Sequence, residues 1–233
     1  PYESKNGSFD CNPWQGNWLM RTEDNIQIEG IMAFIDRDNI DTDQIIPTEY
    51  LKSIKKFGYE DYLFDGWRYL DEGKLGVSKT SRKLNNEFIL NQPIFMTSKI
   101  LLARDNFGCG SSREHAVWAL RDFGIQVIIA SSFGDIFYNN CFKNGLLPIN
   151  LSRSVIDRLF QLSAQDAQLV KVCLQSRNIY VQGEEFSFNL EDDLADRIIN
   201  QFDDIDISLK FADKISCFEQ DRITKRPWIF YNE

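Results

Sequence analysis

The sequence predicts an α/β fold, and three stretches of the chain carry this prediction. Residues 26–35 are alternating and apolar, which is typical of a β-strand with one face on a core. Residues 99–130 have the pattern of a strand, a helix and a second strand, the order of a βαβ unit. Residues 179–188 form two strand-like halves separated at Gly183, which indicates a β-hairpin.

The remaining elements follow in chain order. The first strand ends at the acidic turn 36–39, and in the polar, aromatic segment 48–92 we expect most rings to pack locally. In the βαβ unit, strands at 99–103 and 126–130 flank a helix at 114–123, where apolar residues recur at helical spacing. We then expect a short helix at 132–140, a strand at 145–150, a helix at 155–162 and a connecting element at 167–172.

An amphipathic helix is predicted near the end of the sequence. Phe211, Ile215 and Phe218 are spaced i, i+4 and i+7, so they share one helical face. Such a face packs on the chain's own core by default, and an interface with another protein is the alternative.

The stretch Asn106–His115 links the first strand of the βαβ unit to its helix, and we expect the chemistry there. Ser111-Ser-Arg-Glu114 fits the S-x-x-E capping box, so Ser111 or Ser112 is expected to cap the helix while Glu114 reaches back to the turn. The free amides and positive dipole end of a helix N-terminus favour an anion. We therefore predict a carboxylate or phosphate site, with Arg113 as a bidentate clamp.

Small residues within this stretch allow several interpretations. Gly108 and Gly110 let the backbone approach a ligand closely, but neither GxxxxGK[ST] nor GxGxxG is present, so a nucleotide is a minor alternative. Cys109 suggests a nucleophile, yet the only histidine, His115, follows inside the same capped helix and is expected to be structural. A well-capped helix after a glycine turn is the simplest alternative.

Composition limits the classes of function. A chain of 233 residues with 43% hydrophobic content can form a real core, and its net charge of -9 argues against nucleic-acid binding. No run approaches a membrane span and no secretion signal is visible, so we expect a cytoplasmic protein. The five cysteines are scattered without a C-x-x-C pair, and we expect no iron–sulfur cluster or other metal in this chain alone.

Four stretches of the chain form a pattern of motifs. They are Asn39–Pro47 (NIDTDQIIP), Ile100–His115 (ILLARDNFGCGSSREH), Ser132–Tyr138 (SFGDIFY) and Asn144–Pro148 (NGLLP). In their order and spacing these motifs resemble the aconitase superfamily and, within it, the family of isopropylmalate isomerase small subunits. The similarity covers roughly Gly30 to the C-terminus, whereas residues 1–22 look foreign to the pattern.

The resemblance implies a fold and an assembly. The fold would be an aconitase-type swivelling domain, three-layered β/β/α, with a mixed barrel-like sheet and flanking helices. Residues 23–233 would form this single domain with a C-terminal helical tail, and residues 1–22 an extension of unknown role. The other domains and a [4Fe-4S] cluster would belong to a large partner subunit, because a dehydratase needs a Lewis acid.

The resemblance also implies roles for individual residues. Ser111 would be the catalytic base, reacting as an alkoxide beside Arg113 at the helix N-terminus. Asp43 would line the site and pair with a histidine from another domain, whereas Asp41 is expected to be structural. The remaining predicted substrate contacts are Gly110, Ser112, Arg113 and, in the loop that selects the variable arm of the substrate, Lys52.

The predicted function is that of a hydro-lyase small subunit, which interconverts 2- and 3-isopropylmalate in leucine biosynthesis and is active only with its large subunit. Its substrate would be a small dicarboxylate. Lys52 is a basic residue of the kind that tricarboxylate-type relatives carry, whereas the insertion that includes 62–67 favours isopropylmalate. The alternatives are a related hydro-lyase acting on homoaconitate or a methylated malate, and a non-catalytic anion-binding module.

Overall fold

The computed structural model describes residues 20–22, 25–52, 57–74, 76–77, 79–164, 166–202 and 204–229. Most of the segment 1–22, which we treat as an extension, therefore lies outside the described residues. Its last three residues form strand β1, which pairs antiparallel with the start of β2 through Met20 and Gln27.

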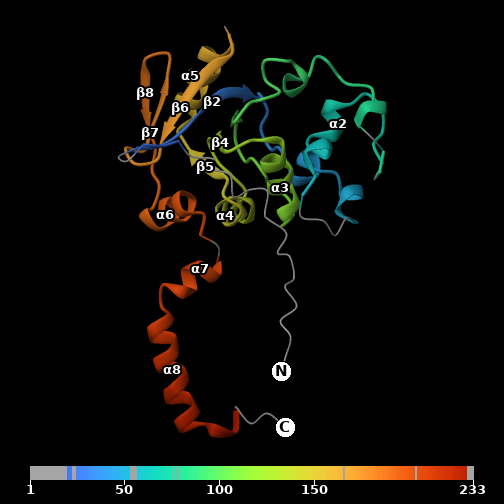
Figure 1. Cartoon of the computed structure of the whole chain (residues 1–233). Helices are drawn as coiled ribbons and strands as arrows, with labels where there is room; N and C mark the ends of the chain where they lie inside the picture. The colour runs from blue at the N-terminus through green and yellow to red at the C-terminus, as the bar shows by residue number, and fades with distance from the viewer. Residues whose placement is uncertain are drawn as a thin grey trace.

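A mixed sheet forms the centre of the molecule (Figure 1). Its strand order is β5-β4-β3-β2-β6-β7-β8, with β1 added to β2. β2 to β5 run parallel along that order, whereas β6, β7 and β8 are antiparallel additions. The strands are β1 (Met20–Thr22), β2 (Asn25–Phe34), β3 (Ile100–Leu102), β4 (Val127–Ala130), β5 (Leu147–Asn150), β6 (Gln168–Cys173), β7 (Asn178–Val181) and β8 (Glu184–Ser187).

The predicted connecting element at 167–172 is wrong, because all of it except Ala167 belongs to β6, which pairs with β2 inside the sheet. Gln168, Val170 and Val172 are buried, whereas Leu169, between the first two, is 57% exposed, so the segment has the two-residue period of a strand. The period extends over few residues and follows a helix closely, which hides it in the sequence. The hairpin turned at Gly183 is confirmed as β7 and β8.

Helices cover both faces of this sheet (Figure 1). The predicted helices at 114–123, 132–140 and 155–162 correspond to α3, α4 and α5. Among the described residues, no helix is long and apolar enough to cross a membrane. The helices are α1 (Thr42–Ile45), α2 (Asp65–Arg68), α3 (Glu114–Phe123), α4 (Asp135–Lys143), α5 (Arg153–Ser163), α6 (Asp192–Asn200), α7 (Asp204–Leu209) and α8 (Ala212–Lys225), with short 3-10 turns η1 (Thr48–Lys52), η2 (Glu60–Tyr62), η3 (Lys79–Ser81), η4 (Ile89–Asn91) and η5 (Pro227–Ile229).

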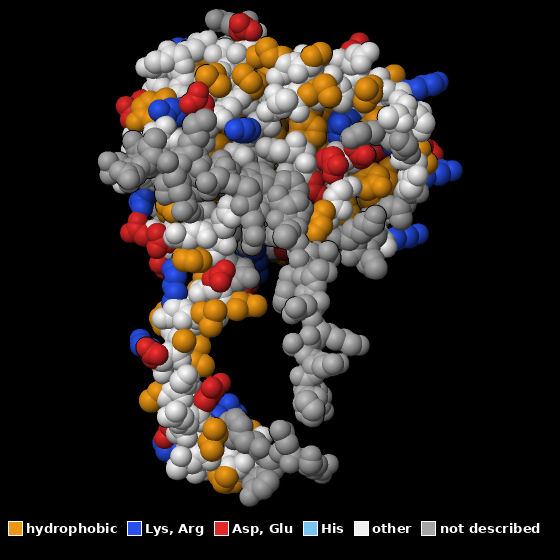
Figure 2. Space-filling model, viewed as in Figure 1, with side chains coloured by type: hydrophobic (Ala, Val, Ile, Leu, Met, Phe, Trp, Pro, Cys, Tyr) orange, Lys and Arg blue, Asp and Glu red, His pale blue; other side chains and the backbone are white. Residues whose placement is uncertain are grey.

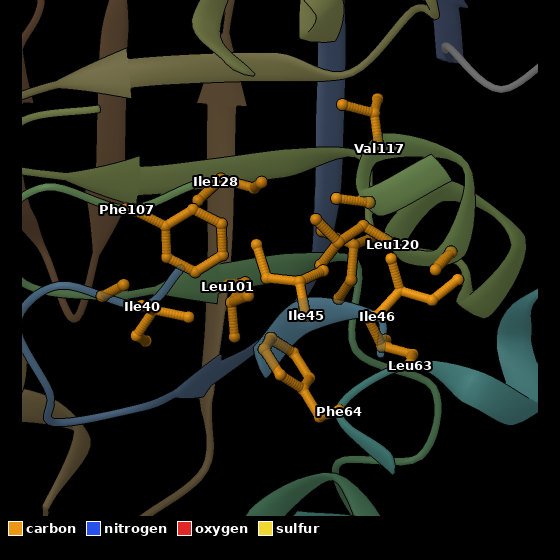
Figure 3. Close-up of a cluster of buried hydrophobic side chains, with 14 of the residues drawn as sticks. Ile40, Ile45, Ile46, Leu63, Phe64, Leu101, Phe107, Val117, Leu120 and Ile128 are labelled. Atoms are coloured by element: carbon orange, nitrogen blue, oxygen red, sulfur yellow. The ribbon is translucent and has the colours of Figure 1, made fainter. Parts of the chain in front are cut away.

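The core has two parts, one on each face of the sheet. Along β3, Ile100 and Leu102 point into the part shared with α5 and the hairpin, whereas Leu101 points into the part shared with α1 and α3. This double burial explains why the parallel strands are continuous apolar runs. Figure 3 shows the second part, in which Leu120 of α3 and Ile45 of α1 converge on the sheet.

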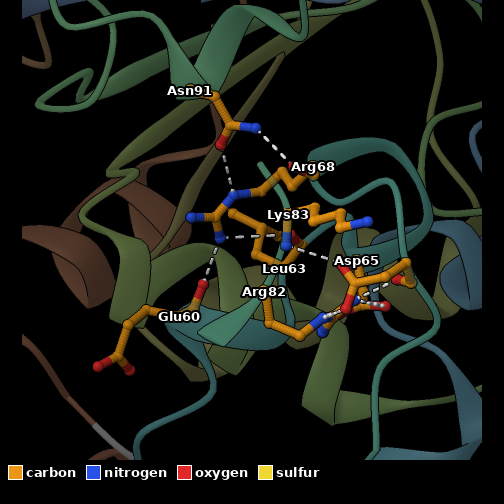
Figure 4. Close-up of polar contacts among 8 residues, drawn as sticks. Glu60, Leu63, Asp65, Arg68, Arg82, Lys83 and Asn91 are labelled. Atoms are coloured by element: carbon orange, nitrogen blue, oxygen red, sulfur yellow. Dashed lines mark hydrogen bonds and ion pairs between the residues drawn. The ribbon is translucent and has the colours of Figure 1, made fainter. Parts of the chain in front are cut away.

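The aromatic segment after α1 packs locally, as predicted, around buried charge (Figure 4). The Arg82 side chain is only 5% exposed, and it pairs with Asp65 at 2.8 Å and with Asp71 at 2.9 Å. Buried Arg68 donates to the carbonyl of Glu60 at 2.6 Å. These bonds satisfy charges that burial would otherwise destabilise, and they hold the segment together.

The terminal helices α7 and α8 project away from the sheet and its covering helices (Figure 1). Every described residue between 204 and 229 is exposed except Ile207, which is half-buried. The prediction that the helix carrying Phe211, Ile215 and Phe218 packs on the core is therefore wrong. Helical periodicity fixes which residues share a face, but it does not specify what that face meets.

Candidate active site

The site lies where the carboxyl ends of the parallel neighbours β2 and β3 meet, the usual place for a ligand in such sheets. The chain leaving β2 and the loop leaving β3 run side by side. The amide of Gly108 donates to the carbonyl of Ile40 at 2.7 Å, and the amide of Thr42 donates to the carbonyl of Cys109 at 2.9 Å. Two motifs far apart in the sequence therefore form one structural unit.

The same loop is held from its other side by the turn before α4. The amide of Phe107 donates to the carbonyl of Ser132 at 3.0 Å, and the amide of Gly134 donates to the carbonyl of Phe107 at 2.9 Å. Gly108 has φ +72°, and a Cβ there would lie 2.2 Å from the ring of Phe137. Only glycine fits this position, so the loop can be pressed against α4 and fixed.

Ser111, the predicted base, is exposed and is held by a buried threonine. The Ser111 amide donates to Thr42 Oγ1 at 3.2 Å, and the two hydroxyl oxygens also lie 3.2 Å apart. Thr42 is 1% exposed. Because its oxygen already accepts the amide proton, the Thr42 hydroxyl is free to donate to Ser111 Oγ.

Sequence reasoning missed Thr42 as a site residue. Its partner lies 69 positions further along the chain, so no local spacing reveals the contact. The available signal was its place between Asp41 and Asp43 in a motif that already carried a predicted site residue.

Arg113 and Asp43, both predicted site residues, form an ion pair. Asp43 Oδ1 also accepts a hydrogen bond from the Thr48 hydroxyl at 2.6 Å. The bond from Arg113, and secondly that from Thr48, hold the pKa of the Asp43 carboxyl below its usual value. The Arg113 side chain is 20% exposed and that of Asp43 is 54% exposed, so the pair faces outward at the rim of the loop.

The predicted capping box at Ser111–Glu114 is wrong. The N-cap of α3 is Arg113, which makes no side-chain capping bond. Glu114 is the first helical residue, and its Oε1 accepts a hydrogen bond from Asn144 Nδ2 at 2.8 Å instead of reaching the turn. Ser111 does not cap because it lies two residues before the N-cap, where its amide and hydroxyl contact Thr42 instead.

A capping box does exist, at the start of α1. Asp41 Oδ1 accepts from the amide of Gln44 at 2.7 Å, and Gln44 Oε1 accepts from the amide of Asp41 at 3.0 Å. Asp41 therefore has the structural role predicted for it. The cap fixes the orientation of α1, on which Thr42 and Asp43 both lie.

The residues just before α3 are open to solvent. Gly110, Ser111 and Ser112 are exposed, and Gly110 has φ +98°, a conformation that favours glycine. The first amides of a helix have no partner within it, and α3 begins directly behind these residues. Lys52 is exposed at the end of η1, and residues 53–56 of its loop lie outside the described residues.

The cysteine and histidine of the motif have separate environments. Burial, and secondly the charge of Asp41, raise the pKa of the Cys109 thiol, so a thiolate is disfavoured. The His115 ring lies against Tyr59 and Trp118, with centroids 5.5 and 4.6 Å away. Burial lowers the pKa of His115. The pattern of a cysteine nucleophile activated by histidine is not favoured by these contacts.

Comparison with known proteins identifies relatives of this chain. Residues 22–154 match the family described as "Aconitase C-terminal domain". A Marinobacter nauticus protein named 3-isopropylmalate dehydratase small subunit is 50% identical over 206 residues, which cover 88% of this chain and 96% of the relative. A Neisseria gonorrhoeae protein of the same name is 48% identical, with coverage of 88% and 97%.

A solved structure is also similar. It is the crystal structure of 3-isopropylmalate dehydratase from Methanocaldococcus jannaschii, with a TM-score of 0.56 and 26% sequence identity. The similarity covers 83% of this chain and 99% of the archaeal chain. The mixed sheet with flanking helices is therefore the predicted fold.

Proposed function

This chain belongs to the aconitase superfamily, among the small subunits of 3-isopropylmalate dehydratase, and we propose that the start of α3 supplies the base and a carboxylate site of that hydro-lyase. The reaction is the isomerisation of 2-isopropylmalate to 3-isopropylmalate. A proton leaves the carbon beside one carboxylate and the hydroxyl leaves the neighbouring carbon, and water then adds in the reversed sense. The observation that supports our assignment most is the contact between Ser111 and Thr42.

In this proposal Ser111 Oγ is the base. An alkoxide needs stabilisation, and three features of the site offer it. The Thr42 hydroxyl lies 3.2 Å away and can donate to the anion. The Arg113 guanidinium is two residues along the chain, and the positive end of α3 begins directly after it. Ser111 accepts the proton in the dehydration and returns it in the rehydration.

Arg113, Ser112 and Gly110 would hold a substrate carboxylate. Arg113 presents a planar fork of donors that matches a carboxylate, and its Nη1 is already positioned by Asp43. Gly110 and Ser112 are exposed beside it, so their backbones can approach the same anion. Asp43 acts in this arrangement by fixing the direction of Arg113. We also propose that Asp43 faces the partner subunit, because its side chain is the more exposed of the pair.

The proposed enzyme is completed by a large subunit. Ser111 and Ser112 are exposed and Arg113 is partly exposed, whereas base catalysis by an alkoxide requires a site closed to water. Four cysteines are described, and they do not fit a cluster site: Cys109 is in the loop, Cys141 and Cys173 are buried, and Cys217 is on α8. We propose that the partner holds the [4Fe-4S] cluster, which supplies the Lewis acid for the leaving hydroxyl.

Reconstitution tests this proposal. The chain is co-expressed with the large subunit of the same organism, and turnover of 2-isopropylmalate is compared with that of homoaconitate and methylated malates. We expect isopropylmalate to have the highest kcat/KM, and each subunit alone to be inactive. A complex that turns over none of these diacids would overturn the proposal.

We propose Lys52 as the specificity residue. It is the last residue of η1, and Thr48 at the start of η1 bonds the site residue Asp43. Replacing Lys52 with leucine should change the ranking of alkyl-malates more than the rate on the best substrate. An unchanged ranking would remove Lys52 from the specificity assignment.

A further inference from the structure

The tail, defined here as residues 204–229, exposes more apolar surface than a free protein normally does. Figure 2 shows hydrophobic side chains along it, clear of the rest of the molecule. Single exposed apolar residues are common, but a run of large ones on one element marks an interaction site. The exposed set is Ile205, Leu209, Phe211, Ile215, Phe218, Ile223, Trp228 and Ile229.

The side chains of α8 are sorted by face. Phe211 at its N-cap, then Ile215 and Phe218, are spaced to form one stripe, and basic groups border it. Lys214 lies over the Phe211 ring at 5.6 Å, and Arg222 lies over the Phe218 ring at 5.9 Å. The opposite face carries Gln220 and Thr224, among other polar residues. The stripe is therefore built as a contact surface with a charged rim.

The base of the tail, in contrast, is fixed to the rest of the protein. Arg197 of α6 pairs with Asp204 at the start of α7. Lys210 lies over the ring of Phe202 at 4.4 Å. These contacts direct the tail away from the sheet before α8 begins. An isolated helix of 14 residues is marginal in water, so α8 needs a partner surface for stable helicity.

We propose that the tail is an arm that docks on the large subunit, an inference that rests on the function proposed above. The described tail has 26 residues, and one side of a standard protein interface uses about 20–30 residues. Relatives covering 88% of this chain are named small subunits, so the partner available to it is a second kind of chain. A second copy of this chain is the competing occupant, and the oligomeric state of the chain alone distinguishes it in the test below.

A docking arm would keep the large subunit over the open site. If the two subunits met only through the small surface at the start of α3, they would bind each other weakly. A separate docking arm raises the local concentration of the partner at the site, in the way that a second binding contact does. The arm then sets how tightly the subunits bind, while the chemistry stays at α3.

Two matched double variants of the full chain test the arm. Phe211→Ala/Phe218→Ala removes the centre of the stripe, and Gln220→Ala/Thr224→Ala changes the opposite face of the same helix. Each is titrated against the purified large subunit, and the dissociation constant and the plateau of activity are measured. We expect the stripe variant to weaken binding at least about tenfold, since buried aromatic anchors dominate interface energetics. The plateau should be unchanged, and the control should match the wild type.

The outcomes separate this inference from the proposed function. If the wild-type subunits assemble and turn over substrate but the stripe variant binds as tightly as the control, the arm is wrong and the function stands. If the wild-type chain is a dimer alone and the stripe variant is a monomer with unchanged affinity for the large subunit, the tail pairs two copies, which also overturns the arm. If the wild-type subunits fail to assemble, the proposed function itself fails.

Discussion

Helices α3, with 10 residues, and α8, with 14 residues, have opposite surroundings. Ala116, Ala119 and Leu120 of α3 are fully buried, and the exposed residues Ser111 and Ser112 lie just before this helix begins. No residue of α8 is buried, although Ile215 and Phe218 share one of its faces. The difference shows that an apolar helical face can serve two purposes. On α3 the apolar face packs in the core and so fixes the position of the candidate site before the helix. On α8 we infer that the apolar face provides a surface for another subunit.

The largest effect is expected at the start of α3. Ser111→Ala in the assembled enzyme should lower kcat by about 10²–10⁴, the usual contribution of a general base. KM should change little, because the lost interaction acts in the transition state. Ser111 does not cap α3, so the variant should also fold normally, which thermal unfolding can check. Near-normal turnover of a folded complex would remove Ser111 as the base.

The next effect contrasts the two helices directly. Leu120→Ala should lower the free energy of unfolding by about 2–5 kcal/mol, because it leaves a cavity in the core. Ile215→Ala, at a position 42% exposed on α8, should change it by less than about 0.5 kcal/mol. Urea unfolding of the isolated chain measures both. Equal losses would mean that α8 packs on the protein in solution.

Substitutions at buried Thr42 test whether catalysis depends on its hydroxyl contact with Ser111. Thr42→Val keeps the shape but removes the hydroxyl, so kcat should fall about 10- to 100-fold, the value of a hydrogen bond of about 1.5–3 kcal/mol to a charged group. Thr42→Ser retains the hydroxyl and should recover most of the rate. If the serine variant is as slow as the valine variant, then Thr42 acts only through packing.

The smallest effect concerns charge at the rim of α3. Because Arg113 and Thr48 lower the pKa of Asp43, the carboxylate and its ion pair persist at neutral pH. The pairing is lost only as the pH falls through this lowered value, below the ordinary aspartate value of about 3.9. Carboxyl chemical shifts followed by NMR should place the Asp43 midpoint there, and Arg113→Gln should raise it. A midpoint at the ordinary value in the wild type would mean that the pair is open in solution.

Much of the fold was predictable because its signals are local. The strand at 26–35, the βαβ unit and the hairpin at Gly183 each have a period that reflects which side is buried. The strand β6 was missed because its alternation is confined to Gln168–Cys173 and carries a lysine. The core packing of the last helix was predicted wrongly, because an apolar face in a sequence does not identify its neighbour.

The site was predictable in part, for a related reason. The loop 106–113, with Ser111 and Arg113, was found from its composition and its resemblance to a family. Its contacts to Thr42 and Asp43 span some 70 positions, so local spacing gave no access to them. The S-x-x-E pattern failed as a cap because α3 begins later, with Arg113 as its N-cap, while Ser111 contacts Thr42. Long-range hydrogen bonds are therefore the part of the site that local spacing does not reveal.

One titration tests the central claim that α3 carries the chemistry and α8 carries the assembly. Isomerase activity is measured against increasing large subunit for the wild type, Ser111→Ala and Phe211→Ala/Phe218→Ala. We expect Ser111→Ala to lower the plateau by about 10²–10⁴ without moving the midpoint. The tail variant should move the midpoint at least about tenfold without lowering the plateau. A tail variant that lowers the plateau at an unchanged midpoint, or a Ser111→Ala enzyme with a normal plateau, would contradict this division of roles.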